Sequence, residues 1–189
     1  MIESRKKLRI LMITVLFSAV SFILMIFPQV PIIPGASFLK LELSIIPLLL
    51  LAHFFGIRYG LLGVLLRSVL HLILLNQGVI TWIGLPINIV AVIVYMLILS
   101  YLRRKNVWLA IIASTIALTL VEIFANIFFA LPLYAEFMNY NIGKIIGLGK
   151  YILLMVLPFN LIEGLVWGFV YYPIEKIFEK IFPQTIMIE

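Results

Sequence analysis

The sequence predicts an all-α membrane protein, a bundle of six transmembrane helices that forms a single membrane domain over residues 1–189. Hydrophobic residues make up 65% of the chain and charged residues 12%, whereas globular proteins carry about 25% charged residues. No charged residue occurs between Ile10 and Leu39, and about 18 apolar residues are enough to cross the hydrocarbon core as a helix. The polar and apolar alternation of a barrel strand is absent, so the crossings are predicted to be helical.

Six apolar stretches predict the crossings, and prolines, turn sequences and charges set their ends. The first stretch ends at Pro28, the turn sequence Asn76–Gly78 ends the third, and Arg103–Lys105 separates the fourth from the fifth. Beyond Tyr172, the segment that begins at Pro173 is predicted to be a short amphipathic helix on the membrane surface. The predicted crossings are residues 10–27, 43–55, 59–75, 82–102, 108–131 and 151–172, followed by a cytoplasmic tail over 173–189.

The basic residues predict the orientation of the bundle. Ten of the fourteen lysines and arginines fall on the side of the two termini, and the positive-inside rule therefore places both termini in the cytoplasm. The chain is expected to be a multi-pass protein of the cell membrane, in contact with the lipid bilayer. The net charge of +6 is explained by this topology, so no nucleic-acid partner is expected. The first apolar run is longer than a typical signal-peptide core, and we expect it to be retained.

Several function classes are disfavoured by what the sequence lacks. Cysteine and aspartate are absent, and no phosphate-binding loop of the G-x-x-x-x-G-K-[ST] type occurs. His53 and His71 lie on different predicted helices without cysteine or aspartate beside them, so neither a metal site nor a cofactor is expected. Any ATP hydrolysis must come from a partner, and the chain is predicted not to be an enzyme.

Polar residues inside the predicted crossings point to a cavity in the outer half of the bundle. Ionisable groups in a bilayer cost roughly 2.5 to 3.5 kcal/mol each and usually face a cavity or a partner. Glu122 and Asn126 are four residues apart and Asn160 and Glu163 three apart, so each pair shares one helix face. Amides offer donors and acceptors to the edge of a heterocycle. The alternative for Arg67 is a salt bridge to Glu122 that only joins helices.

A stripe of small polar residues marks the first predicted helix. Thr14, Ser18 and Ser21 follow one another at spacings of four and three residues. Small residues let a second helix approach closely in lipid. The stripe is predicted to dock another membrane subunit, and the alternative is packing within this bundle.

Four segments, in order along the chain, resemble one family: the riboflavin-binding S components of energy-coupling factor (ECF) transporters. Phe38–Pro47 looks like its F-L-K-x-D-x-S-x-x-P segment, and Arg67–His71 is similar to its K-N-x-x-H stretch. Asn126 with Leu131–Tyr134 resembles N-Y-F-x-x-L-P-L-Y. Pro158–Gly164 is similar to P-F-N-x-x-K-G. The last two are the more specific, because each pairs a membrane asparagine with a proline.

The resemblance implies a six-helix protein that captures riboflavin near the outer face and delivers it with a membrane T component and two cytoplasmic ATPase subunits. Asn126 and Asn160 would hydrogen-bond the flavin, which is cargo rather than a cofactor. By the same resemblance the other substrate-binding candidates are Leu39, Lys40, Leu41, Asn88, Tyr134 and Glu163.

The chain also departs from the family pattern. Glu163 replaces a lysine, and Leu85 stands where a glutamate is expected. Since a carboxylate repels a phosphate, Glu163 predicts that riboflavin is preferred over its phosphorylated form. Thr14, Ser18 and Ser21 replace the A-x-x-x-A surface with which the family docks its T component. Two alternatives stay open: an S component for a different vitamin, and an integral membrane enzyme built on Glu122 and Glu163.

Overall fold

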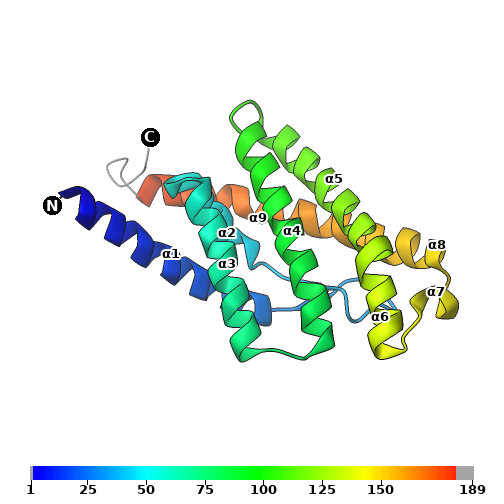
Figure 1. Ribbon diagram of the computed structural model, residues 1–189. Helices are drawn as coiled ribbons and strands as arrows, with labels where there is room; N and C mark the ends of the chain where they lie inside the picture. The colour runs from blue at the N-terminus through cyan, green and yellow to red at the C-terminus, as the bar shows by residue number, and fades with distance from the viewer. Residues whose placement is uncertain (1, 182–189) are drawn as a thin grey trace.

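The structure is a computed structural model that describes residues 2–181, and it consists of tilted helices joined by short loops (Figure 1). A two-residue pairing of β1 with β2 joins the first two helices, and two π-helical turns, η1 and η2, interrupt the later ones. The elements are α1 (Ile2–Ile26), β1 (Val30–Pro31), β2 (Lys40–Leu41), α2 (Ile45–Phe55), α3 (Ile57–Leu74), α4 (Val79–Leu102), α5 (Val107–Ala125), η1 (Asn126–Ala130), α6 (Leu131–Met138), α7 (Ile142–Ile145), α8 (Leu148–Tyr151), η2 (Ile152–Val156) and α9 (Leu157–Ile181).

Within residues 2–181, five helical segments are long and apolar enough to cross a membrane, which agrees with the predicted all-α membrane fold. The predicted crossing over residues 43–55 corresponds to α2, which has only 11 residues. At about 1.5 Å per residue, such a helix reaches roughly half of the 30 Å hydrocarbon core. The count of six crossings therefore stays a prediction, as does the side on which the termini lie. The five segments are Ser4–Ile26, Ile57–Leu74, Val79–Leu102, Val107–Met138 and Leu148–Ile181.

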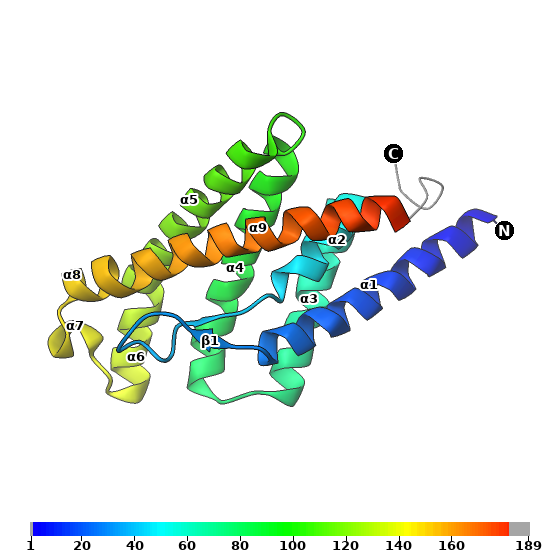
Figure 2. The same cartoon turned by 180° about the vertical axis from the view of Figure 1, so that it is seen from behind.

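The start of α1 and the end of α9 lie at the same end of the bundle, which we call the terminal end (Figures 1 and 2). α4 packs against α5 and α5 against α9, while α1 packs against α2 and α3. The β1–β2 segment and the helices α6 to α8 lie at the other end, which we call the loop end (Figure 2).

The short helix α2 forms the centre of the bundle. Ten of its residues are buried, because α1, α3, α4 and α9 all contact it. Trp167 of α9 is 1% exposed, and its indole N–H donates to the backbone oxygen of Glu42, 2.8 Å away. Tyr95 of α4 packs edge-on against Trp167 and donates to the backbone oxygen of Gly164 at 2.8 Å. These two hydrogen bonds join α9 to α4 and to the segment that leads into α2.

Two glycines one turn apart allow α9 to approach α5 closely. A Cβ atom at Gly164 would lie 2.8 Å from Thr115 Oγ1, and one at Gly168 would lie 2.4 Å from Ile111 Cγ2. Both distances are too short for a real contact. This is the small-xxx-small arrangement by which helices associate in lipid, here used within a single chain.

Each π-helical turn precedes a proline. Leu131 N–H donates to the backbone oxygen of Asn126, and Leu157 N–H donates to that of Ile152, five residues back in each case. Proline lacks an N–H, and its ring clashes with the carbonyl four residues earlier. For Pro132 and Pro158 that carbonyl lies inside the π-helical turn, where the hydrogen bonds run five residues back instead of four.

Two of the helix boundaries predicted from the sequence differ from those in the structure. Helix α9 passes through Pro173 and continues to Ile181, so the segment predicted to be a separate surface helix is continuous with the helix of the sixth predicted crossing. Residues 182–189 of the predicted tail lie outside the described residues. A proline is tolerated inside membrane helices where neighbouring groups satisfy the freed carbonyl. The fifth crossing likewise extends beyond residue 131, through η1 and α6 to Met138.

The small polar stripe of α1 lies inside the bundle. Thr14, Ser18 and Ser21 are at most 1% exposed. Thr14 and Ser18 donate to backbone oxygens four residues earlier in α1, and Ser21 donates to the backbone oxygen of Ser44 at 2.6 Å. A docking side chain must be exposed, so the prediction of a partner-docking surface is not met here. The structure shows the packing alternative, against α2 and α3.

Candidate functional site

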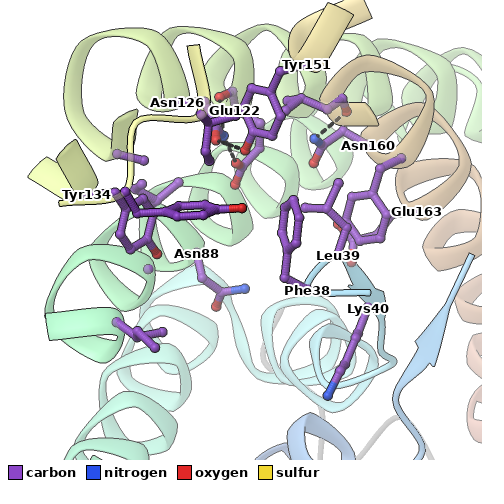
Figure 3. Close-up of a pocket in the computed structure, with 18 of the residues that line it drawn as sticks. Phe38, Leu39, Lys40, Asn88, Glu122, Asn126, Tyr134, Tyr151, Asn160 and Glu163 are labelled. Atoms are coloured by element: carbon purple, nitrogen blue, oxygen red, sulfur yellow. Dashed lines mark hydrogen bonds between the residues drawn. The ribbon is translucent and has the colours of Figure 1, made fainter. Parts of the chain in front are cut away.

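A cavity of about 520 Å³ opens at the loop end, between α4, α5, α6 and α9 and beneath the β1–β2 segment (Figure 3). Its volume lies within the range of roughly 300 to 1,000 Å³ typical of small-molecule sites. The lining residues are Phe38, Leu39, Lys40, Glu42, Ile80, Gly84, Ile87, Asn88, Glu122, Asn126, Ala130, Tyr134, Met138, Tyr140, Ile142, Tyr151, Val156, Phe159, Asn160 and Glu163.

The side chain of Asn126 extends into the cavity from the first π-helical turn, and both its amide nitrogen and its amide oxygen are hydrogen-bonded. Its Nδ2 donates to the backbone oxygen of Glu122 at 2.9 Å and lies 3.3 Å from Glu122 Oε2. Its Oδ1 accepts from the hydroxyl of Tyr151, 2.8 Å away. An amide oxygen has two lone pairs, so Oδ1 can accept a second hydrogen bond from a ligand while Tyr151 keeps its orientation.

Asn160 faces Asn126 from the beginning of α9. It is 3% exposed, and its Nδ2 donates to the backbone oxygen of Val156 at 2.8 Å. This hydrogen bond turns Oδ1 toward the cavity, as Figure 3 shows. The two asparagines therefore present amide oxygens from two different helices to one space, as the sequence predicted.

Three carboxyl groups line the same cavity. Glu122 comes from α5, Glu163 from α9, and Glu42 from the segment between β2 and α2. Lys40 also lines the cavity, but its Nζ donates to Gln29 Oε1 at 3.1 Å, and Figure 3 shows the amine pointing away from the asparagines. Among the described lining residues the charged groups are thus mainly acidic, which disfavours an anionic ligand.

Aromatic rings form part of the walls. Phe38 and Tyr151 stack with ring centroids 6.4 Å apart and planes inclined by 29°. Tyr134, from α6, points into the cavity from the opposite side (Figure 3). Phe159 adds a buried ring next to Asn160. Flat apolar walls with a few fixed polar groups are typical of sites for heteroaromatic ligands.

Arg67 lies outside the lining and is fully buried. Its Nη1 donates to Ser44 Oγ at 2.7 Å and its Nη2 to Asn88 Oδ1 at 2.6 Å. Ser44 in turn donates to Glu42 Oε1 at 2.8 Å. Burial raises the pKa of the Glu42 carboxyl, while the charge of Arg67 and the hydrogen bonds from Ser44 lower it. The sequence-based alternative of an Arg67 to Glu122 salt bridge is replaced by this network.

Seven of the eight substrate-binding candidates line the cavity. Leu41, which is paired with Val30 in the β1–β2 segment, is the exception. The seven are Leu39, Lys40, Asn88, Asn126, Tyr134, Asn160 and Glu163.

Sequence reasoning missed several lining residues. Tyr151 stands at the start of the predicted crossing over residues 151–172, a position that carries no signal for a cavity, yet it donates to Asn126. Glu122 is not among the substrate-binding candidates, although its spacing from Asn126 places both on one helix face. Phe38 and Phe159 belong to the segments used for the resemblance, and their positions next to Leu39 and Asn160 were the available signal.

The terminal end holds a separate polar cluster that closes the bundle. Arg103 donates to the ring of His53, to the carboxylate of Glu175 and, at 3.0 Å, to the hydroxyl of Tyr171. Glu179 lies 3.5 Å from His53 Nε2. The guanidinium of Arg103 compensates the buried carboxylate, and the cluster joins α2 and α9 to the α4–α5 connection.

The chain matches the family model for the substrate-specific component of ECF transporters over residues 9–175. It is 46% identical to the riboflavin transporter RibU of Leuconostoc mesenteroides over 160 residues, which cover 80% of this chain and 82% of the relative. It is 42% identical to the riboflavin transporter RibU of Streptococcus thermophilus over 175 residues, or 88% and 82% of the two chains.

A third relative, the riboflavin transporter RibU of Lactococcus lactis, is 34% identical over 195 residues, covering 93% of this chain and 95% of that one. The solved structure of an S component of a bacterial ECF transporter superposes with a TM-score of 0.74 at 24% identity, over 93% of this chain and 98% of that one. The fold is therefore that of an S component. The match of the family model and the similarity to these three transporters, rather than to enzymes, show that the chain belongs to the family of substrate-specific components of ECF transporters.

Proposed function

We propose that this chain is the riboflavin-binding S component of an ECF-type vitamin transporter. The observation that carries the proposal is the cavity in which Asn126 and Asn160 present amides from two helices between aromatic walls. Riboflavin is a flat heteroaromatic molecule with a polar pyrimidine edge and a hydroxylated tail. Amide groups suit that edge, and the stacked rings of Phe38 and Tyr151 suit a planar ligand. The three relatives named above are riboflavin transporters.

The site residues have distinct roles in this proposal. Asn126 and Asn160 bind the polar edge of the flavin through their amide oxygens. Leu39 and the backbone of Lys40 border the ring from the β1–β2 side, while Tyr134 closes the opposite wall. Asn88 and Glu163 complete the polar lining of the same cavity. In this proposal they hydrogen-bond the hydroxyl groups of the riboflavin tail.

Uptake requires partners that supply energy. The family is one of transporter components, and the sequence contains no phosphate-binding loop. We therefore assign ATP hydrolysis to two cytoplasmic ATPase subunits, coupled through a membrane T component. The protein would lie in the cell membrane with the cavity toward the outside and the terminal end toward the cytoplasm, where the positive-inside rule places the basic residues.

The acidic lining predicts a preference between flavins. Glu42, Glu122 and Glu163 all face the cavity, and a phosphate placed near them would be repelled. Riboflavin should therefore bind more tightly than its phosphate ester FMN. Tighter binding of FMN in titrations of the purified protein would contradict this assignment.

The test is a visible absorption spectrum of the protein purified in mild detergent, followed by chromatography of the ligand released on denaturation. We expect riboflavin to co-purify with the protein. Asn160→Ala should weaken riboflavin binding about tenfold or more, because it removes a buried hydrogen-bonding group.

A matched control is Asn106→Ala, which removes an exposed asparagine that caps α5 away from the cavity. It should retain riboflavin binding. A colourless wild-type protein that also fails to bind added riboflavin would overturn the proposed substrate and leave the fold assignment intact.

A further inference from the structure

One side chain beneath the cavity joins two of its polar lining residues to the rest of the bundle. Arg67 is 0% exposed and does not line the cavity. Its guanidinium reaches Asn88 directly, at 2.6 Å, and Glu42 through the hydroxyl of Ser44. Asn88 and Glu42 both line the cavity, so one buried cation contacts two separate parts of its polar surface.

The chemistry of arginine fixes how the Asn88 amide is turned. A guanidinium has only N–H donors, so the amide atom 2.6 Å from Nη2 must be the oxygen, Oδ1. The Nδ2 group then lies on the other side, and Figure 3 shows it turned toward the interior of the cavity. Within the described part of the chain, no hydrogen bond is made by Nδ2. Both of its protons are available to a ligand.

We infer that Arg67 is a positioning residue that holds the Asn88 amide with its N–H donors facing the ligand. The cavity is otherwise rich in acceptors, because it contains three carboxyl groups and the amide oxygens of Asn126 and Asn160. Asn88 is then the amide that offers its N–H donors, alongside the hydroxyl of Tyr134, to an acceptor of the ligand such as a carbonyl or hydroxyl oxygen. This inference rests on the proposed riboflavin-binding function and assigns a role to a residue outside the cavity.

The surrounding contacts explain why the arginine keeps its position. Ser44 is fully buried; it accepts from Arg67 and donates to Glu42. Its backbone oxygen accepts from Ser21 of α1 at 2.6 Å. A hydroxyl can accept and donate at once, so Ser44 holds the side chains of Arg67 and Glu42 in fixed positions relative to each other. The positive charge also offsets the buried carboxyl group of Glu42.

The sharpest test is Asn88→Asp in the full-length protein, titrated with riboflavin. Aspartate keeps an acceptor oxygen for Arg67, replaces the N–H donors by a second acceptor and adds a negative charge that pairs with the guanidinium, so the bundle should not melt at a lower temperature. We expect riboflavin affinity to fall about tenfold. Unchanged affinity would overturn the inference, since the ligand would then not use the donors. Failure of the wild-type protein to bind riboflavin would overturn the proposed function and the inference with it.

A double-mutant cycle separates positioning from general stabilisation. If Arg67 acts through Asn88, the double variant that carries both Arg67→Met and Asn88→Ala should bind riboflavin no more than about threefold more weakly than Arg67→Met alone. The inference would be contradicted if the loss of affinity in the double variant equalled the product of the losses in the two single variants. Arg67→Lys keeps a charged donor and should bind more tightly than Arg67→Met. The matched control is Ser114→Ala, which removes a buried hydroxyl that bonds only within α5 and should leave affinity unchanged.

Discussion

Replacing Tyr151 by phenylalanine removes a single oxygen atom from the cavity and tests how Asn126 is oriented. The hydroxyl donates to Asn126 Oδ1 at 2.8 Å, and the ring stacks on Phe38. Phenylalanine keeps the ring and loses only the hydrogen bond. Such a bond contributes about 1 kcal/mol, which corresponds to about a fivefold change in an equilibrium constant. The riboflavin dissociation constant of Tyr151→Phe should therefore rise about fivefold.

The assay is the quenching of riboflavin fluorescence on binding to the purified protein, confirmed by calorimetry. Tyr101→Phe is the matched control, because Tyr101 is 73% exposed and does not line the cavity; its affinity should equal that of the wild type. Tighter binding by Tyr151→Phe would refute the reasoning. It would mean that the hydroxyl competes with the ligand for Asn126 instead of orienting it.

Three further predictions concern charge and packing. Glu163→Lys should raise the affinity for FMN relative to that for riboflavin by about tenfold, since it exchanges repulsion of the phosphate for attraction; competition titrations measure the ratio. Gly168→Leu should lower the melting temperature strongly, because even a Cβ there would lie 2.4 Å from a neighbouring side chain, whereas Gly149→Ala, with nothing within 4 Å, should change it little. Arg103→Met should destabilise the terminal end by about 3 kcal/mol, because it removes the guanidinium that donates to the buried carboxylate of Glu175; thermal unfolding with retained riboflavin stoichiometry checks this.

The cavity could be anticipated from the sequence because its main polar groups carry an energetic signature. An asparagine or glutamate inside an apolar run is expensive in lipid, so Asn126, Asn160 and Glu163 stand out without any knowledge of the fold. Their spacing from neighbouring prolines adds to the resemblance to riboflavin-binding S components, and that resemblance indicates the ligand. The seven lining residues that were predicted come from these runs and from the segment that begins at Phe38.

Other parts of the molecule could not be predicted, since a sequence gives the spacing of residues on a helix but not the direction in which that face points. Thr14 and Ser18 form a stripe suited to a partner, yet the stripe turns inward. Gly164 and Gly168 form the actual close helix contact. Tyr151 could anchor the interface equally well, and only the fold brings it to Asn126.

The π-helical turns have a consequence for which side chains line the cavity. One extra residue in a helix rotates everything beyond it by about 100°. In α5 and its continuation, Glu122 lies before the turn and Tyr134 after it, and the extra residue brings these two side chains to one face of the helix, where both line the cavity. The second π-helical turn, η2, likewise precedes Asn160 of α9. The turns thus set which side chains of the two helices face the cavity, and removal of one residue from either turn would rotate the side chains on its two sides out of register by about 100°.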